Sequence, residues 1–292
     1  MPRRLALIVN PSSGGGRALK ALPAVEADLR ARGLEFHTTH TRSLSHGREL
    51  ALRAADAGEV AVTLSGDGLL GAVAGALRGR EDAIIGVLPG GRGNDFARVC
   101  GIPLEPVEAC AVLAEGEPRP VDVGDVGGRT FVGIASLGFD SDANRIANEA
   151  PSWLGNLVYA YGALRALATW RHATFEVVVD GRARTLSGWS VAAANSGAYG
   201  GGMLLAPEAK LDDGLLDVVT TSASSKLVFL RGLPKVFKGT HVELDNVEVV
   251  QGAEVRISAD RPFVVYADGD PIGELPVTIR AVPGAIRVLL PA

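Results

Sequence analysis

Three short apolar runs in the first hundred residues each end in a glycine-bearing turn, and this pattern constrains the fold most strongly. The runs and the turns that follow them occupy residues 5–9 and 10–16, 60–64 and 65–68, and 83–89 and 90–98. Apolar residues resume at helical spacing after the first two turns, which indicates a buried strand, a tight turn and a helix in each. We therefore expect the turns to gather at the carboxyl edge of a parallel sheet, where α/β proteins bind ligands.

The second turn, Gly66-Asp67-Gly68, has the features of a phosphate site. Glycines let the backbone approach a ligand closely, and the first N–H groups of a helix favour an anion. Asp67 cannot itself attract phosphate, so it would hold a cation or a hydroxyl beside one. The alternative is an ordinary strand-to-helix turn with a solvated aspartate, and the motif alone does not decide between the two.

Composition excludes some functional classes. The chain has 292 residues, of which 47% are hydrophobic and 21% charged, with a net charge of −4. This balance argues against general nucleic-acid binding. Cys100 and Cys110 are too few for a disulfide framework, so we expect reduced thiols in a cytoplasmic protein. Since no apolar run reaches the length of a membrane span, a protein acting on lipid would approach the bilayer from the water side.

The pattern of predicted secondary structure changes after Pro120. Short β-prone runs follow, punctuated by the pairs Asp180-Gly181, Asp213-Gly214 and Asp268-Gly269, which favour an antiparallel β-sandwich. We expect only two helices there, over residues 152–171 and 226–238. The predicted class is α/β plus all-β, with domains at 1–120 and 121–283. The last strand, within residues 284–292, can return to the first domain.

Both helices in the second half have two interpretations. The aromatic stretch from Trp153 to Trp170 is typical of a lipid entrance or, more commonly, of a helix packed on the sandwich. Four cations of the later helix can face anionic lipid or simply be solvated; they are Lys226, Arg231, Lys235 and Lys238.

Five motifs in order resemble the diacylglycerol kinase catalytic-domain family, in its soluble bacterial branch, over nearly the full length. The motifs are Asn10-Pro11-Ser12-Ser13-Gly14, Ser65-Gly66-Asp67-Gly68, residues 91–98 (GRGNDFAR), residues 200–218 beginning Gly200-Gly201-Gly202-Met203, and Asp268-Gly269-Asp270.

The resemblance implies an NAD-kinase-like first domain, a β-sandwich second domain and an active site in the cleft between them. It implies ATP- and Mg²⁺-dependent phosphorylation of the hydroxyl of diacylglycerol or a related long-chain alcohol. The partner would be lipid at the inner membrane surface, visited transiently by a cytoplasmic enzyme of phospholipid metabolism. No nucleic-acid partner is implied, and a homodimer is left open.

The resemblance also assigns roles by position. Asp67 and Asp95 would organise metal and phosphates, Asp270 would accept the proton of the lipid hydroxyl, and Asp122 matches an acid at the domain junction. Asp213 and the carbonyls of Leu216 and Val218 match a Mg²⁺ site. The nucleotide contacts would be Asn10, Pro11, Ser12, Ser13, Gly14, Thr41, Gly66, Asp67, Gly68, Leu69, Leu70, Gly71, Ala72 and Arg92.

The chain departs from the family pattern at several positions. Leu69 and Arg92 replace threonines, Gly71-Ala72 replaces an Asn-Glu pair, and Asp270 is one methylene shorter than the family glutamate. Arg92 adds a cation able to bind phosphate with two hydrogen bonds. Two alternatives follow: phosphorylation of a soluble substrate, as in NAD kinases, or a catalytically weak protein that binds nucleotide or lipid.

Overall fold

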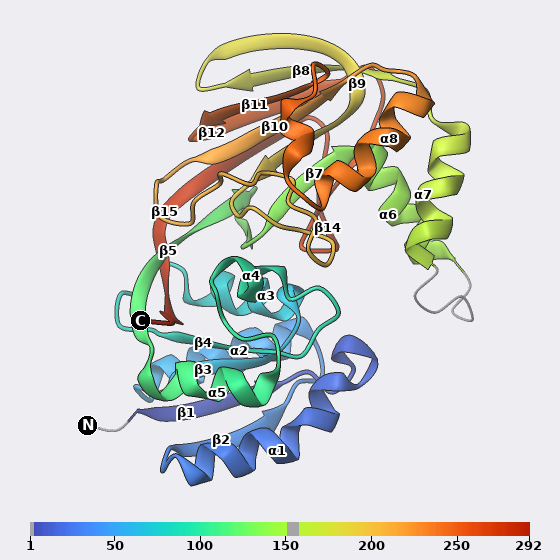
Figure 1. Cartoon of the computed structure of the whole chain (residues 1–292). Helices are drawn as coiled ribbons and strands as arrows, with labels where there is room; N and C mark the ends of the chain where they lie inside the picture. The colour runs from blue at the N-terminus through green and yellow to red at the C-terminus, as the bar shows by residue number, and fades with distance from the viewer. Residues whose placement is uncertain (1–2, 151–157) are drawn as a thin grey trace.

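The computed structural model describes residues 3–150 and 158–292, which form an α/β layer and a β-sandwich (Figure 1). The strands are β1 Arg4–Val9, β2 Glu35–His40, β3 Val60–Ser65, β4 Ile85–Pro89, β5 Glu117–Val126, β6 Arg129–Phe131, β7 Ile134–Gly138, β8 Ala173–Val179, β9 Arg182–Ala194, β10 Leu216–Ser222, β11 Val247–Gly252, β12 Glu254–Ala259, β13 Val264–Ala267, β14 Asp270–Glu274 and β15 Val277–Leu290. The α-helices are α1 Arg17–Ala31, α2 Leu44–Asp56, α3 Asp67–Leu77, α4 Asp95–Val99, α5 Pro106–Glu115, α6 Phe139–Glu149, α7 Val158–Thr169 and α8 Lys226–Val236. Short 3₁₀ helices include η1 Ser13–Gly15 and η3 Thr240–Glu243.

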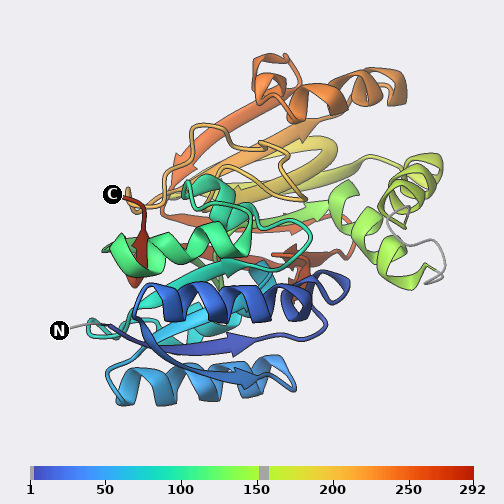
Figure 2. The same ribbon diagram turned by 60° about the horizontal axis from the view of Figure 1, so that its bottom comes forward.

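The N-terminal layer is a parallel sheet in the order β2-β1-β3-β4. Strands β1, β3 and β4 are short, largely apolar and buried, as expected for strands covered by helices on both faces, whereas the edge strand β2 is polar and partly exposed. Helices α1 and α5 contact each other, as do α2 and α3, and the two pairs lie on opposite faces of the sheet (Figure 2). All three strand pairings are parallel, in agreement with the predicted α/β class.

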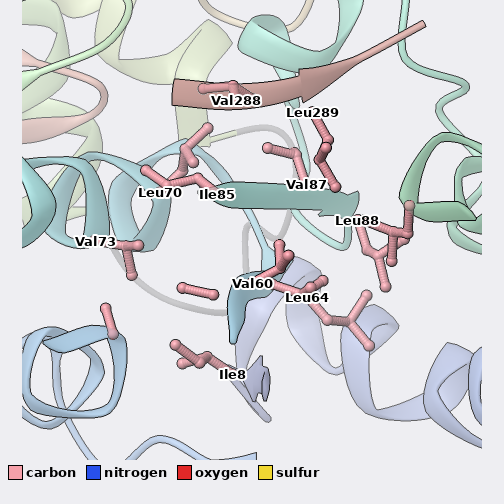
Figure 3. Close-up of a cluster of buried hydrophobic side chains, with 14 of the residues drawn as sticks. Ile8, Val60, Leu64, Leu70, Val73, Ile85, Val87, Leu88, Val288 and Leu289 are labelled. Atoms are coloured by element: carbon pink, nitrogen blue, oxygen red, sulfur yellow. The ribbon is translucent and has the colours of Figure 1, made fainter. Parts of the chain in front are cut away.

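The core of this layer includes side chains from the far end of the chain. Figure 3 shows Val288 and Leu289 of β15 beside Ile85, Val87 and Leu88 of β4. Val288 also pairs with Ile85 in parallel register. The chain terminus therefore completes the edge of the first sheet.

The second half is a sandwich whose two layers share β9. Residues 182–188 of this strand pair with β8, and residues 188–194 pair with β7 and β10. Strands β13 and β14 extend the β7 side, and β12 and β15 extend the β8 side. The predicted antiparallel sandwich is confirmed. Strands β5 and β15 pair along most of their lengths and connect it to the first layer.

Some elements differ from the sequence prediction. Helix α6 is a further helix in the second half, where we expected only two; most of its residues are polar, but Phe139, Ala143 and Ile146 recur at helical spacing and pack on the sandwich core. Residues 152–157 of the expected aromatic helix lie outside the described residues. Trp170 is buried and stacks on Trp189 at 6.0 Å, so this aromatic packs on the sandwich. Within the described residues, no helix is long and apolar enough to cross a membrane.

Candidate active site

Ser13 joins the first two glycine-bearing turns. Its hydroxyl oxygen accepts a hydrogen bond from the Gly66 N–H over 3.0 Å, and the Ser65 hydroxyl donates to it over 3.3 Å. The third turn reaches the second because the Gly90 N–H donates to the Ser65 carbonyl over 2.7 Å. The prediction that the three turns gather at one edge of the sheet is confirmed.

Gly66 and Gly91 let the second and third turns touch. A Cβ atom on Gly91 would lie 2.5 Å from the Cα atom of Gly66. Non-bonded carbon atoms prefer separations of about 3.5–4.0 Å, so a side chain here would push the turns apart. Asn94 fixes the third turn, because its Oδ1 accepts from the Gly91 N–H over 2.8 Å and its Nδ2 donates to the Gly91 carbonyl over 3.2 Å.

Asp67, the first residue of α3, faces the beginning of α4. Its Oδ2 accepts from the Asp95 N–H over 3.0 Å, and its Oδ1 accepts from the Phe96 N–H over 3.3 Å. These are donors that a helix N-terminus leaves without intrahelical partners. Burial raises the pKa of Asp67, while the two N–H groups act in the opposite direction. Asp67 therefore positions α4, a role that its sequence neighbourhood did not indicate.

Asp95 connects the first layer to the loop between β9 and β10. Its Oδ2 accepts from the Gly201 N–H over 2.8 Å, and its Oδ1 accepts from the Gly202 N–H over 2.7 Å. Short hydrogen bonds to a charged acceptor are among the strong ones in proteins. The carboxylate therefore holds a glycine loop of the second half against the third turn.

Strands β13 and β14 form a hairpin that carries two further acids. Asp268 and Gly269 have φ values of 52° and 91°, as a two-residue turn of the type favoured in hairpins requires. The predicted Asp-Gly turn is confirmed at this position. The turn places Asp268 and Asp270 beside the N-terminal half of α3.

Asp268 is held by the segment between β6 and β7. Its carboxylate accepts from the Val132 N–H over 2.8 Å and from the Gly133 N–H over 2.9 Å. Desolvation raises the pKa of Asp268 to about 7; the Val132 N–H opposes this shift, and the charge of Asp67 adds to it. The negative charges of Asp67 and Asp268 therefore repel each other across the boundary between the two halves of the molecule.

Asp270 lies directly opposite the second glycine turn. A Cβ atom on Gly68 would lie 3.2 Å from Asp270 Oδ2. The carboxylate therefore lies against the Gly68 backbone, and a side chain at residue 68 would crowd it. Desolvation by the surrounding protein raises the pKa of Asp270, and the charge of Arg129 lowers it. Asp270 thus faces the turn that contains Asp67, whereas the Asp67 carboxylate itself contacts the Asp95 N–H. That Asp67 and Asp270 act in one site stays a prediction.

A small cleft lies between α3 and the sandwich. Acids and cations face each other in it. Its lining comprises Leu44, Arg48, Gly68, Gly71, Ala72, Arg129, Thr130, Phe131, Ala267, Asp268, Asp270, Pro271 and Ile272.

The remaining predicted nucleotide residues fall into two groups. Leu69 and Leu70 point into the core, so only their backbone groups can contact a ligand. Leu69 packs against Gly47 of α2, where a Cβ atom would lie 2.4 Å from the leucine Cδ1. The replacement of a family threonine by leucine thus serves packing. Thr41 is also buried, and its N–H donates to the Val9 carbonyl over 2.8 Å.

The second group lies in the turns. Asn10 Oδ1 accepts from the N–H and the hydroxyl of Ser12 over 3.2 and 2.9 Å, which closes the first turn around Pro11. Gly14 has a φ of 59° and packs against the Gly90 carbonyl. Arg92 is exposed in the third turn. Its role toward phosphate stays a prediction.

The predicted Mg²⁺ ligands Asp213, Leu216 and Val218 lie away from this cleft. Asp213 is exposed, and its Oδ1 accepts from the Leu215 N–H over 3.0 Å. Val218 is in the interior of β10, with β9 and β11 on its two sides, so its carbonyl points toward a neighbouring strand. Nearby, Asp122 accepts from the Gly214 and Gly284 N–H groups over 2.6 and 2.7 Å. This matches its expected place at the junction of the two halves.

Sequence reasoning missed Asp268, Arg48 and Arg129 as residues of the cleft. The run Asp268-Gly269-Asp270 was a signal, but Asp-Gly is a common hairpin turn, and this interpretation assigned no role in the site to Asp268. The two arginines carried no motif. Only the fold brings them to α3.

Comparison with known proteins agrees with this geometry. Residues 4–126 match the diacylglycerol kinase catalytic domain, and residues 133–290 match the YegS C-terminal NAD kinase beta sandwich-like domain. The chain is 35% identical over 297 residues to a diacylglycerol kinase of Mycobacterium tuberculosis (strain ATCC 25618 / H37Rv), covering 99% of this chain and 95% of the relative. The chain belongs to the diacylglycerol kinase family of lipid kinases.

Other members of the diacylglycerol kinase family are similarly complete matches. The diacylglycerol kinase of Bacillus subtilis (strain 168) is 28% identical, with 99% of this chain and 97% of the relative covered. A solved diacylglycerol kinase structure from Bacillus anthracis str. Sterne has a TM-score of 0.76 at 20% identity, covering 99% of this chain and 97% of that one. A second structure from the same organism has a TM-score of 0.84 at 23% identity, covering 99% of this chain and 95% of that one. These structural likenesses support the fold.

Proposed function

We propose that this lipid kinase transfers the γ-phosphoryl group of ATP to the hydroxyl of diacylglycerol or a related long-chain lipid alcohol. Residues 1–120, with the end of β15, would bind the nucleotide, and residues 121–283 would bind the lipid. The observation that carries the proposal is the position of Asp270 of the sandwich beside Gly68 of the first layer. A candidate proton acceptor on the sandwich thus faces the glycine turn of the first layer that would bind phosphate.

The nucleotide side of the site is built from backbone groups. The N-terminus of α3 presents N–H groups and the positive end of its dipole to the cleft, which favours phosphate oxygens. Gly68, Gly71 and Ala72 line that part of the cleft without large side chains. Positioning and charge neutralisation are the main requirements of phosphoryl transfer. Arg48 and Arg129 line the cleft and Arg92 lies in the third turn, so these cations would supply part of the neutralisation.

The lipid side of the site centres on Asp270. A carboxylate can accept the proton of the attacking hydroxyl when it lies within hydrogen-bond reach. Desolvation moves the pKa of Asp270 upward, which makes it a better acceptor. The charge of Arg129 acts on this pKa in the opposite direction. In this proposal Asp67 and Asp95 hold the third turn and the 200–202 loop around the reacting groups.

A Mg²⁺ ion bound together with the nucleotide would need phosphate oxygens among its ligands, because the described residues contain no group of three or more acidic, histidine or cysteine side chains placed to hold a metal. Asp67, Asp268 and Asp270 all have raised pKa values, and the charges of Asp67 and Asp270 contribute to the shift at Asp268. A divalent cation would relieve this excess of negative charge. Magnesium commonly takes one or two protein carboxylates and completes its shell with phosphate oxygens and water. When bound, the ion would neutralise charge on the phosphates.

One assay tests the proposal. The full chain is incubated with γ-labelled ATP and Mg²⁺, with diacylglycerol in mixed micelles in one tube and NAD in another. We expect labelled lipid and no labelled NAD. Labelled NAD would support the soluble-substrate alternative, and nucleotide binding without any labelled product would support a catalytically weak protein. Either result would overturn the proposal.

A further inference from the structure

Helix α8 has two apolar faces, of which the sandwich covers only one. Phe229 stacks on Trp189, with ring centroids 4.0 Å apart, and meets Phe139 edge-on at 4.8 Å. Gly232 lies on the same covered face, near Leu244. These contacts fix the rotation of α8, so its other face cannot turn inward.

The opposite face exposes large apolar side chains at helical spacing. Leu227, Leu230 and Phe237 follow one another at intervals of three and seven, which places them on one stripe. Their exposed fractions are 57%, 40% and 58%. Leu164 of α7, 64% exposed, adds to this surface near the start of α8, where Lys226 Nζ donates to the Ala168 carbonyl over 2.9 Å. We call Leu227, Leu230, Phe237 and Leu164 the α8 apolar stripe.

A row of cations borders the α8 apolar stripe. Arg231, Lys235 and Lys238 are spaced by four and three residues, and all three are exposed. Residues 223–242 contain no aspartate or glutamate. The next acids along the chain, Glu243 and Asp245, flank Leu244, whose side chain lies against the covered face. The exposed face of α8 is therefore apolar and positive, with no acid of its own helix to neutralise it.

We propose that this face docks the enzyme on the surface of an anionic lipid bilayer. A helix lying in the interface inserts its apolar side chains among the lipids, while flanking cations contact acidic headgroups. The choice of a bilayer as the partner rests on the proposed lipid-kinase function. The surface itself rests on exposure and charge. Docking through α8 would orient the sandwich, which carries Asp270, toward the membrane that contains the substrate.

The test is co-sedimentation of the full chain with large vesicles of phosphatidylglycerol or of phosphatidylcholine, at low and high salt. We expect binding to the anionic vesicles that weakens with salt. Each exposed cation near a membrane surface contributes about fivefold to partitioning, so Arg231→Gln with Lys235→Gln should weaken binding about 25-fold. Leu227→Ser with Phe237→Ser should weaken it at least about tenfold. The matched control, Leu52→Ser with Arg53→Gln on α2, should bind like wild type.

Three results would overturn the docking proposal. The first is wild-type binding by the α8 variants, and the second is an equal loss in the α2 control. The third is a wild-type dimer, seen by sedimentation velocity without lipid, that the α8 changes dissociate; the face would then be a protein interface.

Kinase assays separate this proposal from the function it rests on. With a short-chain diacylglycerol dispersed as monomers, the α8 variants should keep the wild-type rate and lose activity only on vesicles. An equal loss on the monomeric substrate would contradict docking. Absence of wild-type activity on either substrate would refute the proposed function, while the vesicle sedimentation would still decide docking.

Discussion

The link between Asp95 and the 200–202 loop offers a sharp test of how the two halves are held together. Its carboxylate accepts hydrogen bonds from the Gly201 and Gly202 N–H groups over 2.8 and 2.7 Å. A net hydrogen bond to a charged group stabilises a protein by about 1.5–3 kcal/mol. Because water can reach Gly201 once the carboxylate is removed, we take the lower value for each bond. We therefore expect Asp95→Ala to lower the free energy of unfolding by about 3 kcal/mol.

The effect should be local before it is global. In hydrogen–deuterium exchange, residues 197–206 should exchange at least about tenfold faster in Asp95→Ala, while β3 and β4 keep their protection in the native state. Asp95→Asn retains one acceptor oxygen and should show about half the loss in urea unfolding. Unchanged exchange at residues 197–206 would refute the reasoning, whatever happened to the stability of the whole chain.

Three further predictions concern the cleft. Gly91→Ala should separate the second and third turns and cost about 1–3 kcal/mol in urea unfolding, together with weaker ATP binding by calorimetry; wild-type values for both would contradict the contact with Gly66. Arg92→Ala should weaken ATP binding about tenfold or more if the guanidinium contacts phosphate, and an unchanged dissociation constant would exclude that contact. The pKa of Asp268 is about 7 when folded against 3.8 for the free side chain, so the unfolded chain releases this proton first as pH rises. The free energy of unfolding should therefore fall as the pH rises from about 4 to 7, because Asp268 loses its proton more easily in the unfolded chain. Asp268→Asn should remove this contribution to the pH dependence, as measured by urea unfolding across that pH range.

The sequence allowed the local units to be predicted, because strand, glycine turn and helix follow from neighbouring residues. Apolar runs at 5–9, 60–64 and 83–89 became parallel strands, and the Asp-Gly pair at 268–269 became a hairpin turn. Helix α6 was missed because most of its residues are polar.

The partners of the acidic residues were beyond local reasoning. Asp67 bonds to backbone groups 28 and 29 residues away, and Asp95 bonds to groups 106 and 107 residues away. The family resemblance suggested metal and phosphate for both, because no local signal shows which backbone donors a fold will bring near. Asp268 was passed over for the same reason. Its two N–H donors, on Val132 and Gly133, are more than a hundred residues earlier in the chain.

Catalysis in the proposed function depends most on Asp270, which faces the nucleotide turn from across the cleft. The direct measurement is the turnover of Asp270→Asn on diacylglycerol micelles, together with its ATP affinity by calorimetry. Loss of a general base costs about 100-fold or more, so we predict a kcat reduced at least that far with ATP affinity close to wild type. A variant that keeps wild-type kcat would contradict the central role given to this carboxylate.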